Sequence, residues 1–211
     1  EPLVAVAGVA ARKKSGETVS GDAGTCFKRQ DGTLCVLLCD GMGSGPEANR
    51  ESALAVRLLE QFLQAGVETE HALLTLNAAL ALRGETGFTT VDLLQVDLFN
   101  GESVLYKFGA APTYIRKGSQ VRRLTGTSLP AGLDSGEQVR PDKTLLKLEP
   151  GDCVLMVSDG IVGTQDDQWL RDRLLQFDGQ SPKELAASLI TQTPEGATDD
   201  RTALAVKIGK R

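Results

Sequence analysis

An apolar segment that stops at a glycine-rich turn constrains the fold of this chain more than any other feature of its sequence. Residues Thr33–Cys39 are almost continuously apolar, and Asp40-Gly41-Met42-Gly43-Ser44-Gly45 follows them directly. A run of this length and character is typical of a buried β-strand, and the glycines favour a sharp turn. Pro46 then suits the first turn of a helix. The sequence therefore predicts a buried strand, a tight turn and a helix in succession.

Helical periodicity continues beyond this turn. Apolar residues at Val56, Leu59 and Leu63 recur with the period of a helix, which predicts a helix from Pro46 to about Gly66. The same reasoning predicts three further helices, at about Glu70–Arg83, Asp167–Phe177 and Ser181–Thr191.

Most of the remaining sequence is typical of short strands separated by turn residues. Their segments are alternating or β-branched, and pairs such as Asn100-Gly101 and Lys117-Gly118 separate them. The predicted strands are Leu3–Ala11, Gly24–Arg29, Thr33–Cys39, Thr89–Leu98, Ser103–Gly109, Pro112–Arg116, Gln120–Leu124, Thr144–Leu148, Cys153–Ser158 and Thr202–Ile208. Many antiparallel strands with helices segregated outside them predict an α+β sandwich. We find no repeat and no internal linker, so we expect residues 1–211 to form a single domain.

Composition excludes several classes of function. No apolar run approaches the roughly 20 residues of a membrane-spanning helix. A net charge of −5 and few aromatic residues, 4% of the chain, argue against a nucleic-acid-binding surface. His71 is the only histidine, which excludes a zinc site built from several histidines. We therefore expect an acidic globular domain that binds no nucleic acid.

The cysteines indicate no thiol chemistry. Cys26, Cys35, Cys39 and Cys153 form no CxxC pair, and none has an arginine six residues later. That arginine is part of the phosphate-binding loop of cysteine-dependent phosphatases, so this class has no candidate nucleophile here. We expect all four thiols to be reduced, buried and inert.

Four aspartates lie where predicted strands meet turns: Asp22, Asp40, Asp159 and Asp199. Asp40 and Asp159 directly follow strongly apolar runs, which places their carboxylates at the edge of the core. Carboxylates gathered there would repel one another unless a cation neutralised them, and oxygen ligands with few histidines suit Mg²⁺ or Mn²⁺. The alternative is that Asp-Gly pairs are ordinary turn residues. Spacing alone leaves both readings open.

Longer motifs around these aspartates resemble a known family. In order along the chain they are Ser20-Gly21-Asp22, Asp40-Gly41-Met42-Gly43-Ser44-Gly45-Pro46-Glu47-Ala48, Lys107-Phe108-Gly109-Ala110-Ala111-Pro112, Pro150-Gly151-Asp152, Ser158-Asp159-Gly160-Ile161 and Asp199-Asp200-Arg201-Thr202. In this order they resemble the bacterial metal-dependent type 2C serine/threonine phosphatases. More narrowly, they are similar to the sporulation branch of that family, the C-terminal phosphatase domain of stage II sporulation protein E.

This resemblance implies both the architecture and the site. It implies two antiparallel sheets packed as a sandwich, with a centre of two divalent ions, Mn²⁺ or Mg²⁺, at one end. Asp22 and Asp40 would lie between the ions, with the Gly41 carbonyl on one of them, and Asp159 and Asp199 would hold the other. A metal-activated water would then hydrolyse phosphoserine or phosphothreonine without a covalent intermediate.

The resemblance also implies a biological setting. The substrate would be phosphoserine on an anti-sigma-factor antagonist, whose dephosphorylation would release a sporulation sigma factor. The domain would be cytoplasmic, and because the chain starts at Glu1, we expect an excised piece whose membrane attachment would depend on a preceding region. Whether it forms a homodimer is left open. Two alternatives also remain: a stress-response sigma-regulator phosphatase of the same family, and a catalytically silent phosphoprotein-binding module.

Overall fold

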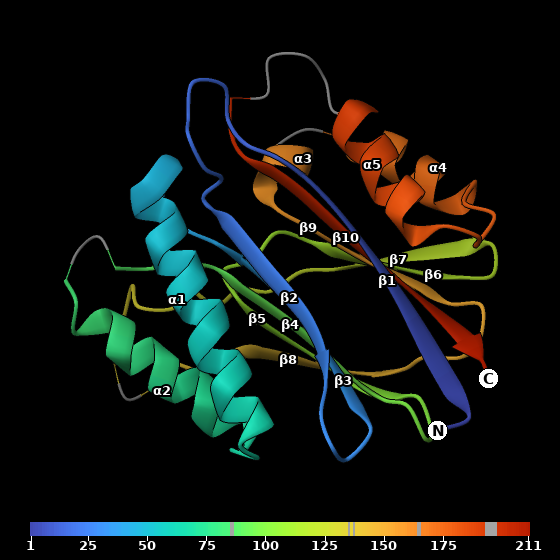
Figure 1. Cartoon of the computed structure of the whole chain (residues 1–211), viewed down its shortest axis with the longest axis horizontal. Helices are drawn as coiled ribbons and strands as arrows, with labels where there is room; N and C mark the ends of the chain where they lie inside the picture. Colours follow the sequence, from blue (N-terminus) through green and yellow to red (C-terminus); the bar gives the residue numbers. More distant parts are fainter. Residues whose placement is uncertain (85–86, 135, 137, 164–165, 193–197) are drawn as a thin grey trace.

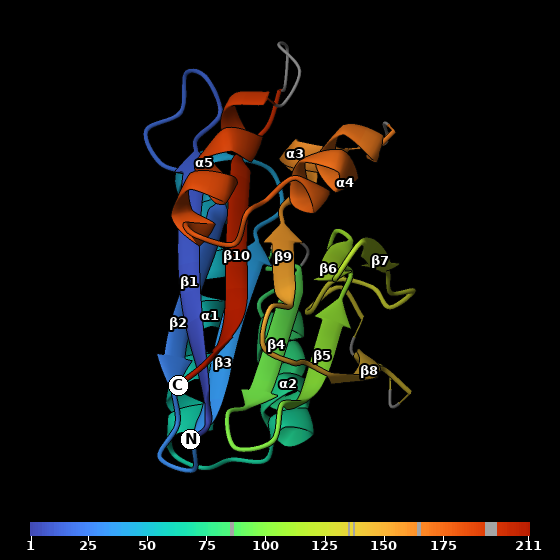
Figure 2. The ribbon, with the colours of Figure 1, turned by 90° about the vertical axis from the view of Figure 1, so that its right-hand side faces the viewer.

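A computed structural model describes residues 1–84, 87–134, 136, 138–163, 166–192 and 198–211. It contains two five-stranded sheets in which all neighbouring strands are antiparallel. Figures 1 and 2 show the two sheets stacked face to face. Sheet A has the order β1 (Leu3–Arg12), β10 (Arg201–Lys210), β9 (Cys153–Val157), β6 (Thr113–Lys117), β7 (Gln120–Leu124). Sheet B has the order β2 (Asp22–Lys28), β3 (Thr33–Asp40), β4 (Val91–Asp97), β5 (Glu102–Phe108), β8 (Asp142–Lys147).

Helices cover the outer faces of both sheets (Figure 1). The first pair, α1 (Gly45–Gln64) and α2 (Thr69–Ala81), packs on sheet B. The second group, α3 (Asp159–Val162), α4 (Gln168–Leu175) and α5 (Pro182–Gln192), packs on sheet A. Among the described residues, none of these helices has the length and apolar character needed to cross a bilayer.

The burial of the strands follows from this layering. β3 and β9 are covered on both faces, so Leu34–Cys39 and Cys153–Val157 are buried throughout. β8 lies at the edge of sheet B and alternates between half-buried and exposed residues. Three apolar layers result: one between the sheets, one under α1 and α2, and one under α3, α4 and α5. The predicted α+β sandwich of two antiparallel sheets is confirmed.

Two expectations from the sequence were wrong. Asp159 does not lie in a plain turn after β9, because it begins the one-turn helix α3. Four residues are too few to give a periodic signal in the sequence. Cys26 is exposed, whereas Cys35, Cys39 and Cys153 are buried. It lies on β2, an edge strand of sheet B, where its side chain points into the incompletely filled space between β2 and β1.

Candidate functional site

Asp22 and Asp40 lie directly opposite each other at one end of sheet B. Asp22 is the first residue of β2 and Asp40 the last residue of β3, and the antiparallel register pairs them. Asp22 is 8% exposed, and its Oδ2 accepts a 2.6 Å hydrogen bond from Thr202 Oγ1 of sheet A. Its Oδ1 is also buried and has no hydrogen-bond partner. One carboxylate oxygen is therefore held in place while the other remains available.

The Asp40–Gly41 turn is fixed by backbone and hydroxyl contacts. Asp40 N donates to Thr90 Oγ1 at 3.0 Å, and Asp40 O accepts from Thr89 Oγ1 at 2.8 Å. Gly41 N donates to Gly21 O at 3.1 Å. A Cβ on Gly41 would lie 2.0 Å from the carbonyl oxygen of Ala48, so the first turn of α1 packs directly on this turn. Only glycine fits at position 41 without displacing the helix.

Sheet A contributes the other two predicted carboxylates. Asp159 begins α3 two residues after β9 ends, and Asp199 lies two residues before β10 begins. The Asp199 Oδ1 accepts the Asp200 N–H at 2.8 Å. A Cβ on Gly160 would lie 1.9 Å from the Asp200 carbonyl oxygen, so α3 and the start of β10 are in close contact. The four predicted aspartates therefore meet at one end of the sandwich, which we call the carboxylate end.

Asp200 anchors the segment between β1 and β2 to the carboxylate end. Its side chain is buried, with Oδ1 accepting the N–H of Lys14 at 2.8 Å and Oδ2 accepting the N–H of Gly21 at 2.7 Å. Both donors belong to the segment between β1 and β2. Asp200 therefore fixes the backbone that leads into Asp22.

The electrostatics of the carboxylate end favour a bound cation. Burial raises the pKa of Asp40 to about 10, and the charges of Asp22, Asp159 and Asp199 add to that increase. Burial also raises the pKa of Asp22 to about 6, although the hydrogen bond from Thr202 opposes the increase. The pKa of Asp199 is raised by burial as well. Each shift means that the site disfavours its own negative charge, and a positive ion would reverse this effect.

The donor set fits a hard divalent ion. All the predicted side-chain ligands offer carboxylate oxygens, which suit Mg²⁺ or Mn²⁺. Asp22 Oδ1 is a buried oxygen without a hydrogen-bond partner. Among the described residues, no three histidine, cysteine or carboxylate side chains already form a compact ligand cluster. The site is therefore a close Asp22–Asp40 pair from sheet B that faces two carboxylates from sheet A.

Several residues that shape the site were not singled out in the sequence. Thr202 and Ser158 act together, because Ser158 Oγ accepts the Thr202 N–H at 2.9 Å while Thr202 Oγ1 binds Asp22. Thr89 and Thr90, directly before β4, hold the backbone of Asp40. Hydroxyl residues are common in strands, so their identity alone carries no signal. Thr202 could have been suspected from its place in Asp199-Asp200-Arg201-Thr202.

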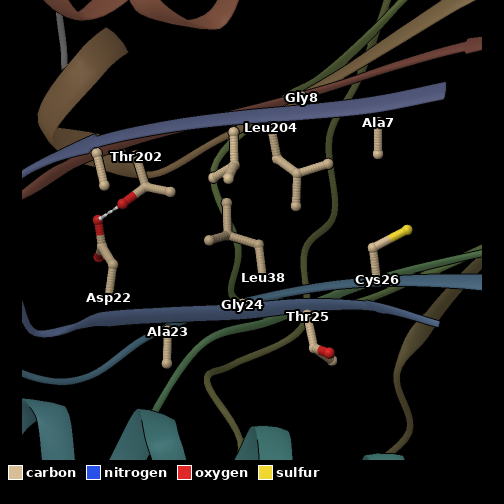
Figure 3. A pocket seen from close by; sticks show the side chains of 12 residues that line it. Ala7, Gly8, Asp22, Ala23, Gly24, Thr25, Cys26, Leu38, Thr202 and Leu204 are labelled. Atoms are coloured by element: carbon tan, nitrogen blue, oxygen red, sulfur yellow. Dashed lines mark hydrogen bonds between the residues drawn. The ribbon is translucent and has the colours of Figure 1, made fainter. Parts of the chain in front are cut away.

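A cavity of about 380 Å³ borders the Thr202–Asp22 contact. Figure 3 shows Leu38 and Leu204 extending into the space between the sheets, with Asp22 and Thr202 joined at one end. Cys26 lies at the other end of the labelled group. Small residues such as Ala7 and Gly24 line the remaining walls, so the space between the edge strands β1 and β2 is incompletely filled.

Comparison with known proteins identifies relatives along nearly the whole chain. Stage II sporulation protein E of Priestia megaterium is 30% identical over 95% of this chain, which spans 36% of that relative. The protein of the same name from Bacillus subtilis (strain 168) is 31% identical over 95% of this chain, which spans 25% of it. This chain therefore covers only about a third or less of either relative's length.

Solved structures match the fold. The PP2C phosphatase domain of SpoIIE from Bacillus subtilis, solved with a fragment of its regulatory domain, has a TM-score of 0.88 and 29% identity, covering 99% of this chain and 64% of that one. RsbX in complex with magnesium has a TM-score of 0.78 at 22% identity, covering 98% of this chain and 96% of that one, and shares the fold. The family model for stage II sporulation protein E (SpoIIE) matches residues 30–209. The chain therefore belongs to the stage II sporulation protein E family and has the type 2C phosphatase fold.

Proposed function

We propose that this domain is a metal-dependent protein serine/threonine phosphatase that hydrolyses phosphoserine on an anti-sigma-factor antagonist. The observation that carries the proposal is the opposed Asp22–Asp40 pair, with Asp159 and Asp199 close enough to raise the pKa of Asp40. Membership of a sporulation phosphatase family supports the substrate class.

The predicted ligand assignment suits this arrangement. Asp22, Asp40 and the Gly41 carbonyl would hold one side of a two-ion centre, and Asp159 and Asp199 the other. Bound Mg²⁺ or Mn²⁺ would supply a water with a lowered pKa and neutralise the charge of the phosphate. The magnesium complex of RsbX, which has the same fold, is consistent with this choice of ion.

The protein's own contribution is orientation. The Thr202 hydroxyl donates to Asp22 Oδ2 and so fixes this carboxylate while Oδ1 keeps no hydrogen-bond partner. Thr89 and Thr90 fix both backbone polar groups of Asp40. A covalent route through a thiolate has little support, because burial raises the pKa of Cys35 to about 11 and of Cys153 to about 12.

The direct test is phosphate release from a phosphoserine-bearing antagonist protein, measured with Mn²⁺ and with a chelator. Asp40→Asn and Asp159→Asn should each abolish the manganese-dependent rate. Asp178→Asn, which changes an exposed aspartate in the turn before α5, should leave it unchanged. Manganese binding without turnover on any antagonist would favour a silent phosphoprotein-binding module. Turnover only on a stress-response antagonist would reassign the substrate within the family, and failure to bind manganese would overturn the proposal.

A further inference from the structure

The carboxylate end is a junction between two sheets, so its geometry depends on how the sheets are spaced. Asp22 and Asp40 belong to sheet B, whereas Asp159 and Asp199 flank strands of sheet A. Any change in sheet spacing at this end would move one pair of carboxylates relative to the other. A feature that fixes the spacing would therefore set the geometry of the site.

Apolar packing alone leaves this end incompletely fixed. The cavity of about 380 Å³ lies between the sheets and borders Asp22 and Thr202. An unfilled space forfeits contacts on its lining, so packing there offers weak resistance to small shifts. Directional polar contacts between the sheets therefore contribute more to fixing the sheet spacing there.

A buried polar cluster joins the sheets a short distance along the strands from the site. Lys107 Nζ of β5 lies 2.9 Å from Asp92 Oδ2 of β4, and Thr113 Oγ1 of β6 donates to the same oxygen at 2.7 Å. The Lys107 and Asp92 side chains are only 3% and 2% exposed. Because β4 and β5 belong to sheet B and β6 to sheet A, Asp92 joins the two sheets. We call Lys107, Asp92 and Thr113 the inter-sheet cluster.

The register places this cluster close to the site on both sheets. Asp92 pairs with Leu38, two residues before Asp40. Thr113 pairs with Met156, three residues before Asp159. The cluster is therefore connected through short stretches of strand to a predicted ligand on each sheet.

Lys107 also holds the chain where it crosses between the sheets. Its Nζ donates to Ala111 O at 2.7 Å, within the segment that leads from β5 of sheet B to β6 of sheet A. One ammonium group therefore binds a strand of sheet B and the crossover into sheet A.

The cluster is poorly suited to a role in stability alone. Asp92 Oδ2 accepts both hydrogen bonds, whereas Asp92 Oδ1 is buried without a partner. Removing two charges from water costs free energy that such a pair does not fully recover, and apolar replacements of similar volume are often neutral or stabilising. What the ion pair provides and apolar side chains do not is a directional contact with one preferred separation.

We propose that the inter-sheet cluster is a positioning device that fixes the spacing of the two sheets at the carboxylate end and thereby sets its affinity for divalent ions. This inference rests on the proposed metal-dependent function. Lys107, Asp92 and Thr113 act through the strands that carry Asp40 and Asp159 and are not ligands themselves.

The test compares manganese affinity, measured by titration calorimetry, with stability, measured by urea unfolding in chelator. Thr113→Val removes the hydrogen bond by which the cluster joins the sheets and keeps the side-chain shape. It should weaken manganese binding about tenfold, the low end for residues that orient metal ligands. Thr113→Ser keeps the hydroxyl and should retain the native affinity. Thr144→Val, at a half-buried position of β8, is the matched control and should also retain it.

A triple variant separates positioning from stability. Lys107→Met, Asp92→Leu and Thr113→Val together replace the inter-sheet cluster with apolar groups and leave the net charge unchanged. We expect unfolding at the same or a higher urea concentration, together with at least tenfold weaker manganese binding. If the triple variant does not fold, the manganese affinity of Thr113→Val alone tests the proposal.

The outcomes are distinct. Native manganese affinity in Thr113→Val and in a folded triple variant would overturn the inference and leave the proposed function intact. Equal losses of manganese affinity in Thr113→Val and Thr113→Ser would also overturn it, because the hydroxyl would then make no difference to binding. Absence of manganese binding by the unmodified domain would overturn the proposed function and this inference with it.

Discussion

Asp40 is a residue whose negative charge the fold strongly disfavours. Its pKa is raised above the ordinary value, so the folded state binds its proton more tightly than the unfolded state does. The corresponding stability is present at low pH and is lost as pH rises toward the folded-state pKa of about 10. At neutral pH in chelator, Asp40→Asn should therefore stabilise the domain by roughly 1–3 kcal/mol while abolishing manganese binding. Urea unfolding with and without chelator measures both effects.

Asp31→Asn is the informative control for that prediction. The Thr33 N–H donates to Asp31 Oδ1 in the turn between β2 and β3 and lowers the pKa of this exposed carboxyl. Removing its charge should slightly destabilise the domain, opposite in sign to Asp40→Asn. Equal effects at the two positions would show that the carboxylate end does not penalise its own charge.

At position 200, two backbone N–H groups need two acceptor oxygens, which favours aspartate over asparagine. The two carboxylate oxygens of Asp200 accept separate backbone N–H groups, from Lys14 and from Gly21. An asparagine has only one acceptor oxygen, so Asp200→Asn would place an NH₂ group against an N–H donor. We expect a loss of about 1–3 kcal/mol in stability and weaker manganese binding, because the segment leading into Asp22 loses an anchor. Native manganese affinity in this variant would contradict that role.

At the scale of the element, helix α1 and the Asp40–Gly41 turn behave as one packed unit. The methyl group introduced by Gly41→Ala would lie 2.0 Å from the Ala48 carbonyl oxygen, so the helix or the turn must move. Overpacking of this kind costs about 1–3 kcal/mol, and here it should also remove manganese binding. Calorimetric titration of the folded variant measures this loss.

Gly118→Ala provides the comparison in the β6–β7 turn. Gly118 has a φ of +55° with nothing within 4 Å of an added Cβ, so alanine there causes backbone strain without displacing a neighbour. Its stability should fall by about 1 kcal/mol with manganese affinity unchanged. If both variants lost affinity in proportion to their stability, the packing of α1 on the turn would have no specific role in the site.

At the scale of the whole molecule, local pattern predicted the elements but not the contacts between them. Each strand and each helix of two or more turns has its own periodicity, and each of the four aspartates borders an apolar run or turn. The contacts that complete the site join distant residues. Thr202 binds Asp22 across 180 positions, and Asp200 binds Gly21 across 179. Such partners become visible only when β10 and β2 are assigned to facing sheets.

The same reasoning explains why the inter-sheet cluster escaped prediction. Lys107 and Asp92 are charged residues within otherwise apolar strands, and such a charge can face solvent at a sheet edge or be buried with a partner. β4 and β5 are interior strands of sheet B, and their register places Asp92 opposite Lys107. The pairing follows from topology, which no local window of sequence contains.

Ion binding and folding should be coupled across the whole domain. An ion that binds only the folded state stabilises it by about 2.7 kcal/mol at one hundred times its dissociation constant. Protons compete for the same carboxylates, and the pKa of Asp22 is raised to about 6, so this stabilisation should grow as pH rises from about 5 to about 8. In chelator the trend should reverse, because charging these carboxylates without an ion destabilises the folded state. Urea unfolding across that range, with excess Mn²⁺ and with chelator, should give two curves that diverge with pH. Parallel curves would mean that manganese binds away from the carboxylate end.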